Sequence, residues 1–197
     1  MNIFIPEDLL EAAGEYLWLL TRGYPQKASL KLVGDKFMLS RDMRQVLYRG
    51  ISARKEADRR KEMIGTIRGG ERVLIDTYNV LFTVNNYLLG RPVFICNDGL
   101  LRDAGEMRGR IISKPVFGRS VDLMLEVLKE YESAEFLLYL DEPVSFSGRL
   151  AMELSEKMTQ MDIRGEAMTV KSPDHQLRHE PGDAICTSDT AIIDHYD

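Results

Sequence analysis

The sequence predicts an α/β fold with a mainly parallel sheet flanked by helices, preceded by a small all-α module. Residues 1–70 carry apolar side chains at helical spacing, whereas residues 71–197 alternate short apolar runs with helical stretches. The second pattern is the βαβ alternation that is typical of parallel sheets. Gly65, Gly69 and Gly70 lie where the pattern changes. We therefore expect two domains, a helical one over 1–70 and an α/β one over 71–197.

The first domain is expected to consist of helices with recognisable ends. Apolar residues from Leu9 to Leu20 line one face of a helix, which Gly23-Tyr24-Pro25 breaks. A second apolar stripe ends at Gly34-Asp35, and Ser40 has the position of an N-cap for a third helix. A short helix, a glycine-containing turn and a capped helix give a helix-turn-helix-like outline.

The second domain is expected to alternate strands and helices. Strands are predicted at 72–76, 92–96, 135–141, 166–171 and 184–187. Helices are predicted at roughly 79–89, 99–108, 119–131, 145–160 and 189–194. The polar stretch 172–183 is expected to form a loop over the site.

Charge is distributed unevenly along the chain, although the formal net charge is only −5. The segment from Thr21 to Arg72 holds 14 Lys and Arg against 6 Asp and Glu, whereas the segment from Val73 onward holds 12 against 21. A basic segment beside an acidic one suggests a polyanion partner for the first and a cation for the second, unless both are ordinary solvated surfaces. The candidate nucleic-acid contacts are Arg41, Arg44, Arg54, Arg59 and Arg60.

The composition is that of an ordinary globular protein. No apolar stretch approaches membrane-spanning length, and residues 1–8 lack the basic and apolar regions of a signal peptide. Cys96 and Cys186 both lie in apolar, strand-like runs, so reduced thiols are expected rather than a disulfide. These observations favour a cytoplasmic protein with no membrane partner, and they leave its oligomeric state open.

Three apolar runs of strand length each end at an aspartate, namely Asp76, Asp141 and Asp189. In an open parallel sheet the carboxyl ends of the strands share one edge, so these side chains would converge. Converging carboxylates repel each other unless a cation lies between them, and Mg²⁺ or Mn²⁺ suits such oxygen ligands. Asp174 is a candidate fourth ligand. The alternative for each aspartate is that it caps the following helix.

Further polar residues are candidates for supporting roles. Asn79 stands one helical turn after Asp76, where it would orient that carboxylate or a metal-bound water, and Ser188 is expected to position ligands or water. The stretch after residue 144 opens a predicted helix, whose free amides would form a phosphate seat or would simply be capped. The residues expected in that seat are Ser145, Ser147 and Arg149.

Other chemical motifs are weak or absent. Asp98-Gly99 is first of all a turn signal, and the roles of Asp98 and Asp103 stay open. The spacing of His175, His179 and Cys186 is a poor match to a zinc site. The sequence contains no P-loop, G-x-G-x-x-G, G-x-S-x-G or C-x-x-C motif.

The segment Leu74-Ile75-Asp76-Thr77-Tyr78-Asn79-Val80 resembles the opening motif of NYN domains, a branch of the PIN-like ribonuclease superfamily. Leu138-Tyr139-Leu140-Asp141 is similar to their second strand, and Cys186-Thr187-Ser188-Asp189 is similar to their Thr-Ser-Asp motif, with Asp174 placed like the preceding acidic residue. The resemblance covers roughly 72–194 and implies a PIN-like sheet with a metal-dependent nuclease site at these aspartates. Thr77 departs from the usual glycine, and Pro143 and the 91–118 stretch are not typical of these nucleases.

The whole chain also resembles a microbial family catalogued as a domain of unknown function, which joins a helical part to the α/β part. The segments that carry this likeness are Leu20-Thr21-Arg22-Gly23-Tyr24-Pro25, Lys31-Leu32-Val33-Gly34-Asp35, Leu47-Tyr48-Arg49-Gly50, Asp98-Gly99-Leu100-Leu101-Arg102-Asp103 and Asp141-Glu142-Pro143-Val144-Ser145. This likeness implies no activity.

The function expected from the sequence is metal-dependent phosphodiester hydrolysis, with RNA rather than DNA as the partner. Asp76, Asp141 and Asp189 would hold Mg²⁺ or Mn²⁺, with Asp174 as a further ligand. The basic helical domain would hold the nucleic-acid backbone. The alternatives are a non-catalytic nucleic-acid binder or regulator, a phosphatase or nucleotidase acting on a small ester, and an interaction module controlled by a partner.

Overall fold

The computed structural model describes residues 6–104 and 115–195. Its contacts divide the chain into two compact units. Unit 1 comprises Met1–Ile64 and Arg91–Gly105, and unit 2 comprises Gly65–Gly90 and Glu106–Asp197. The segment 91–104, which the sequence pattern assigned to the α/β part, therefore packs with the helical part. The chain passes from unit 1 to unit 2, back to unit 1, and again to unit 2.

Unit 1 contains four helices within its described residues, α1 (Glu7–Thr21), α2 (Gln26–Lys36), α3 (Arg41–Gly50) and α4 (Arg54–Met63). Ser40 caps α3 by accepting a hydrogen bond from the amide of Met43, which confirms the prediction for this residue. The expected stop at Gly34-Asp35 is wrong, because α2 continues through both residues. The absence of a side chain at Gly34 leaves room for the guanidinium of Arg44, which a β-carbon there would overlap.

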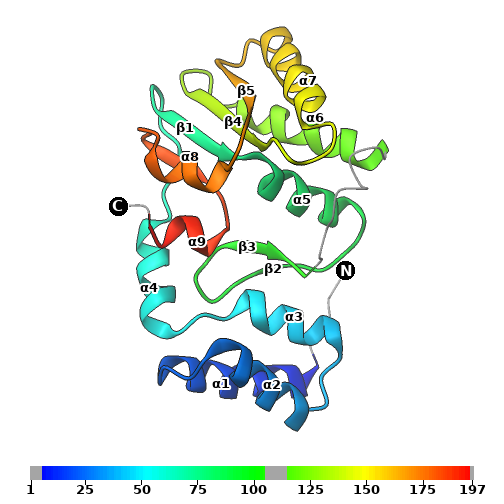
Figure 1. The fold of residues 1–197 in the computed structure, drawn as a ribbon, viewed down its shortest axis with the longest axis vertical. Coiled ribbons are helices and arrows are strands. Elements are labelled where there is room, and N and C mark those ends of the chain that lie inside the picture. Colours follow the sequence, from blue (N-terminus) through cyan, green and yellow to red (C-terminus); the bar gives the residue numbers. More distant parts are fainter. Residues whose placement is uncertain (1–5, 105–114, 196–197) are drawn as a thin grey trace. The chain divides into compact units, whose positions relative to one another are not determined.

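A β-hairpin completes unit 1. Strands β2 (Val93–Ile95) and β3 (Leu101–Asp103) pair antiparallel, as Figure 1 shows. The helix predicted over 99–108 is wrong for residues 99–104, and residues 105–108 lie outside the described part. The turn signal at Asp98-Gly99 decides the local structure, because Gly99 adopts a φ of +82° and the chain reverses there.

The hairpin is fastened to the segment that joins α3 to α4. The side chain of Asn97 accepts a hydrogen bond from the amide of Ser52 at 2.9 Å and donates one to the carbonyl of Ser52 at 2.8 Å. The amide of Asn97 donates to the carbonyl of Gly50 at 2.9 Å. The hairpin tip therefore satisfies backbone groups that α3 and α4 leave open between them.

A buried ionic cluster links the hairpin to α4. Asp98 is completely buried, and Arg102 donates two hydrogen bonds to its carboxylate, each at 2.9 Å. Arg60, which is 5% exposed, donates a third at 3.3 Å. Burial raises the pKa of Asp98, but the hydrogen bonds and charge of Arg102 outweigh it and hold the value below the ordinary one. The cluster thus keeps Asp98 ionised and holds the hairpin against α4.

Unit 2 is an α/β unit built on a four-stranded sheet. Its strands are β1 (Arg72–Asp76), β4 (Glu135–Asp141), β5 (Gly165–Val170) and β6 (Ala184–Cys186). Their order is β5-β4-β1-β6, and each neighbouring pair is parallel. The predicted fold class, a mainly parallel sheet flanked by helices with a helical part before it, is therefore confirmed. Figure 1 shows β1 beside β4 in this sheet.

Helices cover both faces of the sheet. Alternate residues of β1 and β4 pack against α5 (Thr77–Leu88), α6 (Pro115–Lys129) and α7 (Ser147–Gln160). The intervening residues pack against α8 (Pro173–His179) and α9 (Thr190–Ile193). Within 172–183, where the sequence predicted a loop, α8 forms because Ser172 caps it and Pro173 occupies its first turn.

Both cysteines are free thiols, as the sequence predicted. Burial raises the pKa of the Cys186 thiol to about 11 and also raises that of Cys96. Neither thiol is therefore in the reactive thiolate form near neutral pH. Among residues 6–104 and 115–195, no helix has the length and apolar character needed to cross a membrane.

Candidate functional site

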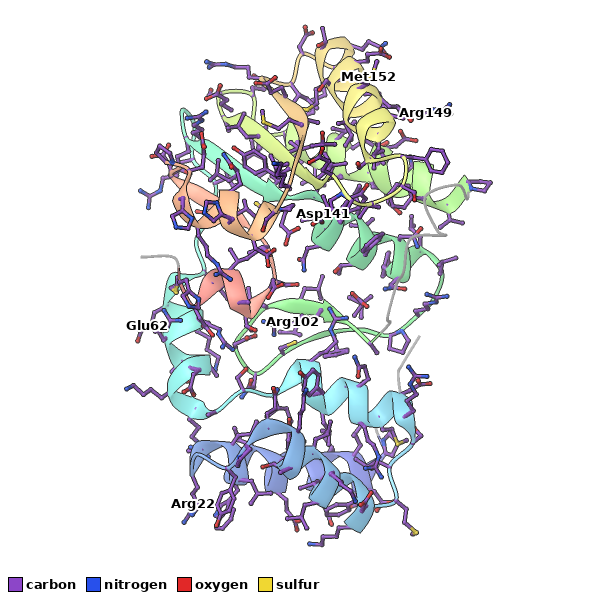
Figure 2. All side chains as sticks on the ribbon, in the orientation of Figure 1. Arg22, Glu62, Arg102, Asp141, Arg149 and Met152 are labelled. Carbon is purple, nitrogen blue, oxygen red and sulfur yellow. The ribbon has the colours of Figure 1, made fainter. Side chains whose placement is uncertain are left out.

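The candidate site lies at the carboxyl edge of the parallel sheet of unit 2. β1 ends at Asp76 and β4 ends at Asp141, while Asp174 and Asp189 follow the ends of β5 and β6. The strand order therefore arranges the four residues along one edge as Asp174, Asp141, Asp76 and Asp189. Figure 2 shows Asp141 at the end of its strand.

The chain diverges at this edge in the way that defines ligand sites of open α/β sheets. β1 and β4 lead into α5 and α7 on one face, whereas β5 and β6 lead into α8 and α9 on the other. Neighbouring strands β1 and β6 thus send the chain to opposite faces, as do β4 and β5. Ligands of open α/β sheets bind at such divergence points.

Asp76 is the most buried carboxylate of the edge, with 8% of its surface exposed. Thr187 donates a hydrogen bond to its Oδ2 at 2.9 Å. Burial raises the pKa of Asp76 to about 6, with Asp189 and Asp174 adding to the rise, although Thr187 and the amide of Asn79 oppose it. Asp76 stands at the N-cap position of α5, and no amide of that helix makes a full capping hydrogen bond to its side chain, although the amide of Asn79 in the first turn lies near enough to lower its pKa.

Asn79 and Ser188 join the ends of β1 and β6. The Oδ1 of Asn79 accepts hydrogen bonds from the amide of Ser188 at 2.9 Å and from its hydroxyl at 3.0 Å. The hydroxyl of Thr187 in turn accepts from the amide of Asp189 at 3.1 Å. These bonds hold residues 187–189 against the first turn of α5 and fix the position of Asp76 relative to Asp189.

The remaining carboxylates are more open. Asp189 caps α9, because its Oδ1 accepts from the amide of Ala191 at 2.8 Å. Asp141 is half-buried, and burial followed by the charge of Asp174 raises its pKa. Asp174 is exposed in the first turn of α8. The edge therefore combines one buried carboxylate with three that reach solvent.

The donor chemistry of the edge suits a hard divalent cation, but the carboxylates are spread out. Within the described residues, no group of three or more His, Cys, Asp or Glu side chains is close enough to hold a metal ion. Mg²⁺ is commonly bound through one or two carboxylates, with water and substrate oxygens completing its shell. The residues present fit that open kind of site and do not form a closed cage.

Tyr78 was missed by sequence reasoning about the site. Its ring stacks on Phe82 with centroids 5.4 Å apart, and its buried hydroxyl has no hydrogen-bond partner among the described residues. Burial raises its pKa to about 12, and the charge of Asp141 adds to the rise. Its polar end therefore lies within electrostatic reach of the edge. Thr187 belongs to the Thr-Ser-Asp segment, but its hydrogen bond to Asp76 could not be predicted from sequence spacing.

Several other predicted residues are engaged within their own units. Arg44 donates to the carbonyl of Leu39 and pairs with Asp35 at 3.0 Å, and Arg60 belongs to the buried cluster around Asp98. Arg41, Arg54 and Arg59 are exposed on unit 1. Asp103 is buried and pairs with Arg49 at 3.5 Å.

The expected phosphate seat is only partly exposed. Ser147 is buried, and its hydroxyl donates to the carbonyl of Glu142 at 3.2 Å. Ser145 and Arg149 are exposed, and Figure 2 shows Arg149 on α7. Neither serine caps α7, because Phe146 stands at the N-cap position without a side-chain capping bond.

The histidines of α8 do not form a zinc site with the nearby cysteine. The rings of His175 and His179 stack with centroids 4.2 Å apart, and the Nδ1 of His179 lies 2.7 Å from the carbonyl oxygen of His175. Cys186 belongs to β6 and joins no metal-ligand group within the described part of the chain.

The fold and the edge together define an α/β protein with an acidic carboxyl edge, joined to a helical unit. The chain belongs to the family described as "Domain of unknown function (DUF5616)", whose model matches residues 66–197. Residues 8–62 match a second model, "Protein of unknown function (DUF434)". A similar protein is "Uncharacterized protein MJ0935" of Methanocaldococcus jannaschii, 30% identical over 185 residues, which are 93% of this chain and 88% of that one. No solved structure matches the chain.

Proposed function

We propose that unit 2 hydrolyses phosphodiester bonds with the help of Mg²⁺ or Mn²⁺, and that its substrate is RNA rather than DNA. The observation that carries the proposal is the state of Asp76. This carboxylate is buried at a divergence point of the sheet, and the charges that act on it come from Asp189 and Asp174. A carboxylate in such surroundings is stabilised when a cation binds beside it.

The four aspartates of the edge have different roles in the proposed metal site. Asp76 and Asp189, which the 187–189 segment holds in fixed relation, are the proposed primary ligands. Asp141 and Asp174 are the proposed outer ligands. A bound divalent ion would polarise the phosphate and lower the pKa of a bound water.

The polar residues of the edge prepare the carboxylates for this chemistry. Thr187 holds Oδ2 of Asp76 through a hydrogen bond, and a carboxylate has further lone pairs with which it would bind a cation. Asn79 holds Ser188 through two hydrogen bonds and so keeps the end of β6 beside α5. Asp141, whose pKa is raised by burial and by the charge of Asp174, is a second carboxylate that a bound cation would stabilise.

Two further observations support the proposal. The segments around Asp76, Asp141 and Asp189 resemble those of NYN domains, and the parallel order of β4, β1 and β6 puts these segments on one edge. Unit 1 exposes basic side chains at Arg41, Arg54 and Arg59, which would contact a nucleic-acid backbone.

The test is cleavage of a labelled RNA strand with and without Mn²⁺. Asp76→Asn is expected to abolish divalent-dependent cleavage. The matched control is Asp162→Asn, because Asp162 is an exposed aspartate in the turn before β5, at the opposite edge of the sheet. Equal cleavage by the two variants would refute the assignment. Hydrolysis of a chromogenic monoester without cleavage of RNA would replace the nuclease by a phosphatase.

A second candidate is a nucleic-acid binder that performs no catalysis. It is favoured by the absence of a three-carboxylate group among the described residues. Calorimetric titration with Mn²⁺ distinguishes the two functions. A nuclease is expected to bind Mn²⁺ through Asp76, whereas a binder that retains RNA affinity without Mn²⁺ affinity would establish the second candidate.

A further inference from the structure

The segment after Asp141 is a tightly bonded turn that emerges from the carboxyl edge. The amide of Glu142 donates to the carbonyl of Val170 at 2.9 Å and so anchors the start of the turn to β5. The amide of Val144 donates to the carbonyl of Asp141 at 3.1 Å, and the amide of Ser147 donates to that of Val144 at 3.0 Å. The Ser147 hydroxyl closes the turn onto Glu142.

This turn holds a phenyl ring out in solvent. Phe146 is 73% exposed and has a φ of 68°, in the left-handed region that side chains rarely adopt. Its carbonyl accepts the first hydrogen bond of α7, from the amide of Leu150 at 3.0 Å. An exposed phenyl ring and a positive φ are both unfavourable for the folded state. The hydrogen bonds of the turn therefore hold Phe146 in this conformation.

Phe146 differs in its place from the other exposed aromatic residues described in unit 2. Tyr87 lies near the end of α5, which begins at the carboxyl end of β1 and carries the chain away from it. Tyr131 lies between α6 and the amino end of β4. Phe146 stands five residues beyond Asp141 on a turn fastened to the carboxyl edge itself.

We propose that Phe146 is a base-stacking residue, which seats an unpaired base of a nucleic-acid strand next to the phosphate bound at the carboxyl edge. This assignment rests on the proposed function and narrows its substrate to strands whose bases are unpaired. An exposed ring offers a flat apolar face to any base, whereas paired bases are already stacked on their neighbours. The fixed turn keeps the ring in place before the strand arrives, so little freedom is lost on binding. Arg149, exposed one turn into α7, would contact the backbone of the same strand.

The test measures binding in the presence of Ca²⁺, so that a hard divalent cation can occupy the carboxyl edge, and the probe is checked for cleavage after each titration. The probe is a short fluorescent single-stranded RNA, and its partner probe is an abasic strand of equal length and charge. Phe146→Gly is expected to weaken binding of the first probe by roughly 5- to 150-fold, the range for loss of one stacked base, and to leave the second unchanged. Phe146→Trp is expected to retain full affinity.

The glycine variant also separates binding from folding. Because glycine adopts a positive φ without strain, Phe146→Gly is expected to melt at or above the wild-type temperature. A variant that is as stable as wild type but binds more weakly has lost a contact and not its fold. Tyr87→Ala removes another exposed ring of unit 2, 70% exposed, and is expected to leave binding of both probes unchanged.

Three results would overturn the assignment. The first is unchanged RNA affinity of Phe146→Gly, and the second is an equal loss for the base-carrying and abasic strands. The third is a change of oligomeric state with RNA affinity intact, which would make Phe146 a protein contact. Weaker binding by Phe146→Gly in a protein that never cleaves RNA would refute hydrolysis alone. Normal binding by this variant together with Asp76-dependent cleavage would refute stacking alone.

Discussion

The substitution Asp76→Asn has a stability effect that can be worked out before any activity is known. Burial, Asp189 and Asp174 place the pKa of Asp76 at about 6 in the folded protein, against an ordinary value of 3.8. At about 1.4 kcal/mol for each pH unit, ionising this group in the apo protein costs at most about 3 kcal/mol. Asparagine keeps an oxygen that can accept from Thr187 and carries no charge.

The sign of the effect follows from the raised pKa. The protonated form of Asp76 is favoured in the folded state, so its contribution to stability is complete below about pH 4 and is lost as the pH rises through about 6. Wild type should therefore lose up to about 3 kcal/mol across this window through Asp76, a loss that the Asn variant should lack. At pH 4 the two proteins should be equally stable.

Differential scanning calorimetry of the apo protein in EDTA is the suitable assay. At pH 7.5 the Asn variant is expected to melt higher than wild type, by roughly 10 °C at most for a unit of this size. Saturating Mn²⁺ should reverse the order, because a ligand present at 1,000 times its Kd adds about 4.1 kcal/mol to a protein that binds it, which exceeds the cost of ionising Asp76. Asp162→Asn should follow wild type at every pH and Mn²⁺ concentration.

The reasoning is refuted if Asp76→Asn destabilises the apo protein at pH 7.5. The ionised form of Asp76 would then stabilise the folded protein, and its surroundings would supply enough positive charge or hydrogen bonds to compensate for burial. An identical response of wild type and Asp76→Asn to Mn²⁺ would separately remove the metal site.

Two further predictions concern unit 1. Reversing the charge of Arg41 and Arg54 together should weaken RNA binding and make the fall of log affinity with log salt less steep by about 1.4. Filter binding at several salt concentrations measures this slope, and an unchanged slope excludes both contacts. Asp98→Asn should destabilise unit 1 by roughly 3–5 kcal/mol, because two buried arginines lose their anion. Urea unfolding, followed by the fluorescence of Trp18, the single tryptophan, measures this loss. The control Asp58→Asn breaks an exposed ion pair and should cost less than about 1 kcal/mol. Equal losses for the two variants would contradict a stabilising role of the buried cluster.

The sheet of unit 2 could be predicted because its strands are local signals. Apolar runs of strand length separated by helical stretches left few other architectures, and the same runs placed Asp76, Asp141 and Asp189 on one edge. The hydrogen bonds that organise the carboxyl edge could not be predicted from the sequence. Thr187 meets Asp76 across 111 positions of sequence, and no local pattern records such a contact.

The errors in unit 1 have one physical origin, which is that long-range contacts override local propensity. Arg60 lies in a charged run, which favours a nucleic-acid contact, but Asp98, 38 positions later, accepts its hydrogen bond in the interior. Gly34 reads as a helix stop, but the guanidinium of Arg44 occupies the space beside it. The local pattern predicts a strand and a helix of the second domain for the hairpin, because nothing in it shows that its partners lie before residue 65.

The hairpin of unit 1 follows the first segment of unit 2 in the chain, and this order matters during synthesis. The helices α1 to α4 leave the ribosome first, yet the anion that neutralises Arg60 is translated only after β1 and α5. The buried ionic cluster of the first unit therefore cannot form when α4 emerges, and Arg60 waits for Asp98 while part of the second unit is made. A fragment that ends at residue 64 lacks Asp98 permanently, so its Arg60 is left without this anion, and adding residues 91–104 back would supply it.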